Sequence, residues 1–171
     1  MAPKNHTDHF YEILKNVAPE LHPFINDHYS TWNLMFSVRE TFSIELYQVA
    51  LEQIEQELNV HFVQEEQLLL PILESYLISN QVGPSAKLID EHRSINKKFV
   101  EVKQLFENFQ KVQDNNENKI ALTKQMNLLA YLVMKHIEKE DHYLYPMLSL
   151  IFTKEEKEKI SLLLQINRSP I

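Results

Sequence analysis

The chain contains a single glycine among its 171 residues. Because average glycine usage is near 7%, a chain of this length would ordinarily carry roughly a dozen. Glycine supplies the positive φ angles of tight hairpins and phosphate-binding loops. The deficit therefore argues against an all-β fold, a GxGxxG dinucleotide-binding fold and a P-loop. It favours a few long helices joined by short connections.

The sequence has no cysteine, which excludes disulfides, thiolate nucleophiles, cysteine-held iron–sulfur clusters and cysteine-bound zinc. Any metal must therefore be held by histidine and carboxylate side chains. The formal charge is −7, and Lys and Arg are scattered along the chain without forming a basic stripe. We therefore do not expect a nucleic-acid partner.

No apolar run approaches the roughly 18 residues that a membrane span needs. The first residues also lack the apolar stretch of a secretory signal. We therefore expect a cytoplasmic protein with no membrane association. The length suits one domain over residues 1–171, with a bundle core at about 22–150 and short peripheral helices at about 8–17 and 154–166.

Four segments, at about 21–35, 47–72, 88–109 and 122–147, carry apolar residues at alternating steps of four and three. Each such row lies along one helix face and forms a seam, the pattern of helices that pack in a bundle. In the second segment this seam continues to Leu68 and Ile72, and in the fourth to Tyr143 and Met147. We predict an all-α fold, an up-down-up-down four-helix bundle with short extra helices at both termini. Gly83, ahead of Pro84, is predicted to lie in the connection between the second and third bundle helices.

Polar side chains interrupt these apolar seams at six positions, namely His28, His61, Glu65, His92, His136 and Glu140. A buried glutamate is costly unless it is paired with a cation or binds a metal, and no Lys or Arg occupies a seam. His61 and Glu65 are four residues apart, as are His136 and Glu140, so each pair shares one helix face. With a turn near 112–117, His92 and His136 lie at one level of antiparallel helices. We predict a metal site inside the bundle.

Imidazole and carboxylate ligands without a thiolate suit iron or manganese better than zinc, whose closed sites take four ligands. Six ligands could surround one ion, but two carboxylates on facing helices are better placed to bridge two. Each ion would then keep open positions for water, O₂, NO or peroxide. Glu66, Glu138 and Asp141 lie one position off the seams. We expect them to be solvated or to support the ligands from behind.

Three sequence motifs around the candidate ligands, taken together, are typical of one family. They are His61-Phe62-Val63-Gln64-Glu65-Glu66 running to Leu70-Pro71, Glu91-His92-Arg93, and His136-Ile137-Glu138-Lys139-Glu140 running to Leu144-Tyr145-Pro146. Over about residues 22–150 the chain resembles the hemerythrin-like (HHE cation-binding) family. It looks most like the di-iron RIC proteins, which repair iron–sulfur centres after nitrosative or oxidative stress. The resemblance implies two non-haem iron ions with an oxo or hydroxo bridge. It makes His28, His61, His92 and His136 terminal ligands and Glu65 and Glu140 bridging ligands.

Two departures from the resembling proteins bear on function. RIC proteins usually begin with a cysteine-containing domain, and this sequence has no cysteine. Oxygen-carrying hemerythrins have a second histidine where this chain has Asn96, and an aspartate at the place of Asp141 rather than Glu140. Either Glu140 or Asp141 could therefore supply the second bridge. A ligand set that is one histidine short favours an open, reactive or sensing site over simple oxygen storage.

Three functional hypotheses follow from this sequence. The leading one is a di-iron protein that acts in iron handling or in the response to oxygen, NO or peroxide, with a protein partner for iron delivery. Whether such a protein turns over as an enzyme is left undecided by the sequence. The second is an O₂ or iron sensor or carrier without turnover. The third is a metal-free helical interaction module.

Overall fold

The computed structural model describes residues 6–77, 83–112 and 116–168, and every regular element within these ranges is helical. The α-helices are α1 (His6–Asn16), α2 (His22–Glu40), α3 (Ile44–Gln56), α4 (Phe62–Gln64), α5 (Leu70–Ser75), α6 (Pro84–Lys111), α7 (Asn116–Lys139), α8 (Tyr145–Ile151) and α9 (Lys154–Arg168). The 3₁₀ turn η1 is Pro19–Leu21, and the π-helical segments are η2 (Glu57–His61), η3 (Glu65–Leu69) and η4 (Glu140–Leu144). The all-α prediction is confirmed.

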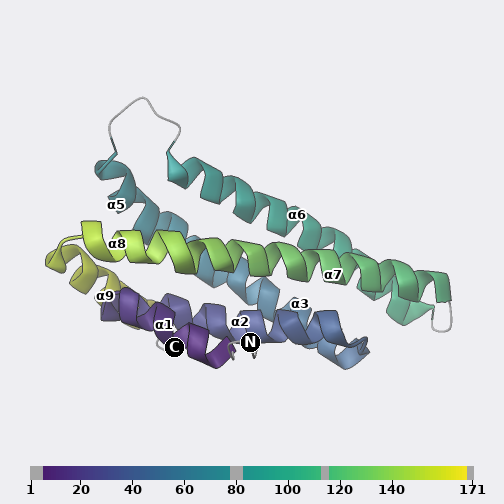
Figure 1. The fold of residues 1–171 in the computed structure, drawn as a ribbon. Helices are drawn as coiled ribbons and strands as arrows, with labels where there is room; N and C mark the ends of the chain where they lie inside the picture. Colours follow the sequence, from purple (N-terminus) through teal and green to yellow (C-terminus); the bar gives the residue numbers. More distant parts are fainter. Residues whose placement is uncertain (1–5, 78–82, 113–115, 169–171) are drawn as a thin grey trace.

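Four long helical segments form the bundle (Figure 1). Bundle helix 1 is α2, bundle helix 2 runs unbroken from α3 to α5, bundle helix 3 is α6, and bundle helix 4 runs unbroken from α7 to α8. Helix α2 packs against α3 and α7, and α6 packs against α7 and α3. Helices α1 and α9 lie outside this set, near η1 and α2 (Figure 1). The predicted up-down-up-down bundle with short terminal helices is therefore observed.

The helix boundaries follow local capping chemistry. The side chain of Ser43 accepts a hydrogen bond from the Leu46 amide at 3.1 Å, which caps α3. Gly83 is the N-cap of α6, with an extended φ of −73°. A Cβ at this position would lie 2.8 Å from Leu77 Cδ1, so the lone glycine permits a close approach rather than a left-handed turn. Gly83 thus lies in the connection where the sequence placed it.

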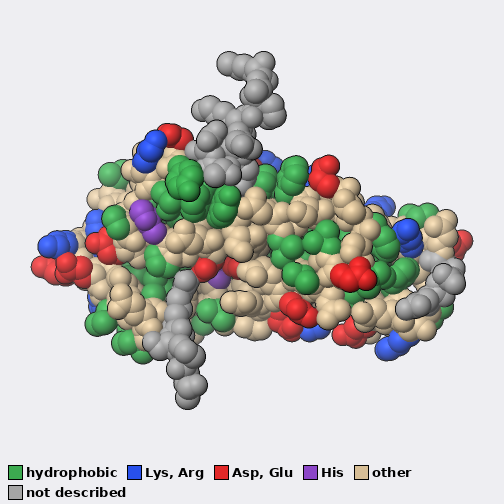
Figure 2. Space-filling model, turned by 90° about the horizontal axis from the view of Figure 1, so that it is seen from below, with side chains coloured by type: hydrophobic (Ala, Val, Ile, Leu, Met, Phe, Trp, Pro, Cys, Tyr) green, Lys and Arg blue, Asp and Glu red, His purple; other side chains and the backbone are tan. Residues whose placement is uncertain are grey.

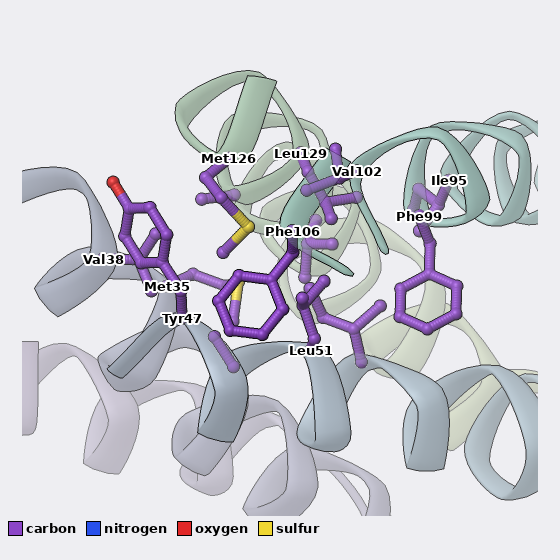
Figure 3. Close-up of a cluster of buried hydrophobic side chains, with 14 of the residues drawn as sticks. Met35, Val38, Tyr47, Leu51, Ile95, Phe99, Val102, Phe106, Met126 and Leu129 are labelled. Atoms are coloured by element: carbon purple, nitrogen blue, oxygen red, sulfur yellow. The ribbon is translucent and has the colours of Figure 1, made fainter. Parts of the chain in front are cut away.

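Two clusters of buried apolar side chains fill the bundle. The first includes Met35, Tyr47, Phe99, Phe106 and Met126, and Figure 3 shows the Phe106 ring among side chains from several bundle helices. The second cluster draws on α1, α2, the segment from Leu69 to Leu73, α8 and α9. The buried histidines and glutamates lie between these clusters along every bundle helix. The bundle therefore has a polar layer in its middle and an apolar core on each side.

The π-helical segments correct the predicted seams beyond the polar layer. The predicted seam residue Tyr143 is 74% exposed, whereas Leu144 and Tyr145 are buried. Likewise Leu69 and Leu70 are buried where the seam predicted Leu68. A π turn closes its hydrogen bond over one more residue than an α turn, so the buried face moves on by one position. The Leu70 amide donating to the Glu65 carbonyl is such a bond.

The surface carries mixed charge. In the face shown in Figure 2, Lys and Arg lie mostly near the outline, while Asp and Glu also occupy the middle. This distribution fits the formal charge of −7. Within the described part of the chain, no helix has both the length and the apolar character that crossing a bilayer requires.

Candidate metal centre

The polar layer brings all six predicted ligands together. His28 comes from α2, His61 and Glu65 from the π segments of bundle helix 2, His92 from α6, and His136 and Glu140 from bundle helix 4. Each of the six side chains is at most 4% exposed. Since every bundle helix contributes, the centre exists only when the four helices are assembled.

The six residues form two groups that share both glutamates. The first group is His28, His61, Glu65 and Glu140, and the second is His92, His136, Glu65 and Glu140. Within each group, one potential ligand atom from every residue lies within 4.8 Å of the others. Each buried cluster could therefore hold a metal ion, and the two positions would be neighbours.

Each glutamate directs one oxygen to each group. Glu65 Oε1 lies 3.2 Å from His61 Nε2, and Glu65 Oε2 lies 3.2 Å from His92 Nε2. Glu140 Oε2 lies 3.1 Å from His28 Nε2, and Glu140 Oε1 lies 3.2 Å from His136 Nε2. The two carboxylates thus span the pair of groups in the way that bridging ligands require. Asp141 takes a different place, facing His28 from behind.

Several atoms that face the centre have no hydrogen-bond partner among the described residues. They are His92 Nε2, His136 Nε2, Glu65 Oε2 and both carboxylate oxygens of Glu140. Leaving a buried polar atom unsatisfied costs about 1–3 kcal/mol, and more for a charged group. Such a concentration of imidazole nitrogens and carboxylate oxygens is the environment that a divalent cation would satisfy. The residues present therefore fit a metal ion.

A carboxylate lies behind each of the four imidazoles, on the side away from the centre. Asp141 Oδ1 lies 2.6 Å from His28 Nδ1, and Glu66 Oε1 lies 2.7 Å from His92 Nδ1. The contacts are longer for His136 Nδ1, 3.4 Å from Glu91 Oε2, and for His61 Nδ1, 3.5 Å from Asp27 Oδ2. For His28, His92 and His136 a carboxylate accepts a hydrogen bond from Nδ1, so a neutral imidazole turns its Nε2 lone pair to the centre.

These charges shift the pKa values of the cluster. Burial by itself lowers the pKa of a histidine, but Glu65 and Asp27 outweigh it and raise the pKa of His61 to about 10. Contacts with Glu140 and Glu65 likewise outweigh burial and raise the pKa of His92 to about 10. Against burial, the neighbouring histidines hold the pKa of both glutamates below the ordinary value. Without a metal, protons on His28, His61 and His92 balance the carboxylates, and a bound cation would replace those protons.

A buried polar network borders the centre on bundle helices 1 and 2. Thr31 Oγ1 donates to Glu57 Oε1 at 2.6 Å, and Gln53 Nε2 donates to both side chains at 2.9–3.0 Å. Glu57 Oε2 lies 3.6 Å from His61 Nδ1. The Phe62 ring stacks on the His92 ring with 3.8 Å between centroids. These contacts hold the imidazoles in place from their outer side.

The sequence interpretation missed four of the surrounding residues: Asp27, Glu57, Glu91 and Tyr145. Of the carboxylates flagged as solvated or supporting, Glu66 and Asp141 contact imidazoles, whereas Glu138 pairs with Lys135 at the surface. A signal was present, since an acidic residue adjoins a candidate ligand in Asp27-His28, Glu65-Glu66, Glu91-His92 and Glu140-Asp141. Tyr145 had no such signal, because the predicted seam placed Tyr143 inside instead.

Comparison with known families agrees with this geometry. No curated protein sequence matches the chain. The family model described as the hemerythrin HHE cation-binding domain matches residues 24–148, which include all six candidate ligands. This match covers most of the chain, and it spans the four bundle helices from α2 to α8. The chain therefore belongs to the hemerythrin HHE cation-binding domain family.

Proposed function

We propose that the chain is a non-haem di-iron protein that acts in iron handling or in the response to oxygen, NO or peroxide. The observation that carries the proposal is the division of each shared carboxylate between two histidine pairs. Glu65 and Glu140 each direct one oxygen to the pair His28/His61 and the other to the pair His92/His136. This arrangement supports two cation positions bridged by two carboxylates, rather than one ion surrounded by six ligands.

The donor set favours iron over zinc. Each position would receive two imidazoles and one oxygen from each glutamate, which saturates a tetrahedral zinc ion. Iron or manganese takes up to six ligands of this type and would keep open positions. Iron bound here would supply redox chemistry toward small oxygen and nitrogen ligands. The protein's part is to fix the donors and to keep bulk water out, since all six are nearly inaccessible.

A small enclosed cavity supports a small ligand. It has a volume of about 10 Å³ and is bordered by His28 and His136, with Ile54, Phe62 and Val133 among its apolar walls. A cavity of this size holds about one water-sized molecule. A ligand within this cavity would therefore be no larger than a small inorganic molecule.

The same cavity favours a second candidate function, an O₂ or iron sensor or carrier without turnover. The cavity between His28 and His136 has no room for a co-substrate next to a bound ligand. The more specific form of the leading proposal is a RIC-like stress role, in which a protein partner receives iron. The metal-free interaction module is disfavoured by the partnerless atoms that converge on the centre.

Iron content tests the metal claim. Anaerobic loading with ferrous iron is expected to leave about two iron ions per chain, with the Mössbauer signature of a coupled pair after oxidation. His61→Ala and His136→Ala should each lose most of this iron. The matched control is His142→Ala, because His142 is exposed and bonds the Glu138 carbonyl. Fewer than about one iron per wild-type chain, or unchanged iron in both centre variants, would sink the proposal.

Turnover separates the two candidate functions. The reduced protein would be given successive portions of NO or peroxide together with an artificial electron donor. Consumption of many equivalents per iron pair would support catalysis. A single stoichiometric oxidation would favour the sensor or carrier.

A further inference from the structure

The two ligand-bearing segments of bundle helices 2 and 4 have the same plan but differ at one buried position. Each has a histidine, a glutamate four residues later and a proline ten residues after the histidine: His61, Glu65 and Pro71, then His136, Glu140 and Pro146. In both segments the residue before the proline follows a π-helical stretch and is buried. That residue is Leu70 in bundle helix 2 and Tyr145 in bundle helix 4.

This difference gives one glutamate a hydrogen bond that the other lacks. Tyr145 is fully buried, and its hydroxyl donates to Glu65 Oε1 at 2.5 Å. Its ring lies against those of Phe24 and His28, with centroid distances of 5.5 and 5.6 Å, which fix its direction. Leu70 offers no donor to Glu140, and among the described residues neither oxygen of Glu140 has a hydrogen-bond partner. The two carboxylates are therefore unequal.

The inequality falls on one side of the centre. Glu65 Oε1, which accepts from Tyr145, is the oxygen that faces His61, whereas Glu65 Oε2 faces His92. A hydrogen bond to a carboxylate oxygen draws charge from that oxygen and makes it a weaker metal ligand, since partners behind a ligand tune its strength. Within the described part of the chain, the position at His92 and His136 has no such donor on its carboxylate oxygens.

We propose that Tyr145 is a positioning residue that makes the two cation positions unequal, with the position at His28 and His61 the weaker. This inference rests on the proposed function, because it presupposes two cations in the centre. The position at His92 and His136 fills first. The position at His28 and His61 fills second and loses its ion first to a chelator.

The test is a two-step cation titration of the full chain. Cobalt(II) serves as the probe, because its visible spectrum follows each binding step under anaerobic conditions. Tyr145→Phe removes a hydrogen bond to a charged group, which returns charge to Glu65 Oε1. The dissociation constant of the second step is therefore expected to fall about tenfold while that of the first stays unchanged. The matched control is Tyr47→Phe, since Tyr47 is equally buried but lies in the apolar cluster away from the centre. It should leave both constants as in the wild type.

A second variant moves the effect in the opposite direction. Incorporation of a fluorinated, more acidic tyrosine at position 145 strengthens the donor, so the second dissociation constant should rise. A merely structural role for the ring would not produce opposite shifts confined to one step. The contrary result is that the wild type, Tyr145→Phe and the fluorotyrosine variant each bind two cobalt ions with the same ratio of first to second dissociation constants. That result would overturn this inference and leave the proposed function standing. A wild-type chain that binds fewer than two ions would instead overturn the proposed function and this inference with it.

Discussion

Each candidate histidine ligand takes its supporting carboxylate from a different bundle helix. His28 on bundle helix 1 contacts Asp141 on helix 4, and His136 on helix 4 contacts Glu91 on helix 3. Helix 3 in turn reaches helix 2 through His92 and Glu66, and helix 2 reaches helix 1 through His61 and Asp27. These contacts close a ring around the bundle. Each helix therefore both presents a ligand and orients the ligand of a neighbour.

Asp141→Asn tests this support. The amide keeps the size of the side chain but loses the negative charge that makes the His28 imidazole a stronger metal ligand. The affinity for the more weakly held cation is expected to fall at least about tenfold, with helicity unchanged, as measured by cation titration and circular dichroism. Glu138→Gln is the control, because Glu138 pairs with Lys135 at the surface. Equal affinities in both variants would show that Asp141 has no such role.

At the scale of the elements, the π-helical segments decide which side chains reach the centre. Glu65 and Glu140 each begin a π segment, and a proline follows each segment after one residue. A proline in a regular α-helix removes a hydrogen bond and clashes with the preceding turn, and a wider turn relieves this conflict. The extra residue turns Tyr145 inward and leaves Tyr143 at the surface. The α-helical spacing used in the sequence interpretation could not anticipate this shift.

The last helix offers an element-scale prediction. Thr153 and Glu156 form a capping box, with the Thr153 amide donating to Glu156 Oε2 at 2.8 Å and the Glu156 amide to Thr153 Oγ1 at 3.2 Å. Thr153→Ala should lower the free energy of unfolding by about 1 kcal/mol, measured by urea denaturation. Ser94→Ala on the exposed side of α6 is the matched control and should change it by less than about 0.5 kcal/mol, since Ser94 bonds only the Asp90 carbonyl of its own helix. Equal losses would contradict the capping role.

At the scale of the whole molecule, the polar layer separates two apolar clusters. Each cluster contains more than ten buried apolar residues drawn from several helices, so hydrophobic burial supports the bundle on both sides of the centre. The layer itself gathers four imidazoles and several carboxylates away from water. Its charge balance depends on protons or on a cation. Stability should therefore depend on both pH and metal.

The metal-free protein should be most stable between about pH 4.5 and 6.5. His61 and His92 have pKa values of about 10 in the folded chain against an ordinary 6.5, so the folded state binds more protons above pH 6.5. The free energy of unfolding then falls as the pH rises from 6.5 to 10. Glu65 and Glu140 have lowered pKa values, so their contribution is lost as the pH falls below about 4.5.

Metal should change this profile. A cation bound in the centre would hold the ligating imidazoles without protons, so the fall between pH 6.5 and 10 should disappear and the melting temperature at pH 8 should rise. Thermal denaturation of chelated and loaded protein across this range measures both effects. A chelated protein whose stability stays flat or increases from pH 6.5 to 10 would contradict the assigned charge balance.

The sequence by itself determined the helical class and the six polar residues of the centre. A near absence of glycine leaves few alternatives to helices, and a histidine or glutamate on an apolar seam is costly unless something binds it. Those signals are local and periodic. Only the tertiary structure decided which oxygen faces which histidine, which carboxylate supports each imidazole, and that Tyr145 reaches Glu65. These contacts join residues from different helices, so the spacing of residues within one helix does not predict them. The π turns also shift the buried face away from regular α-helical spacing.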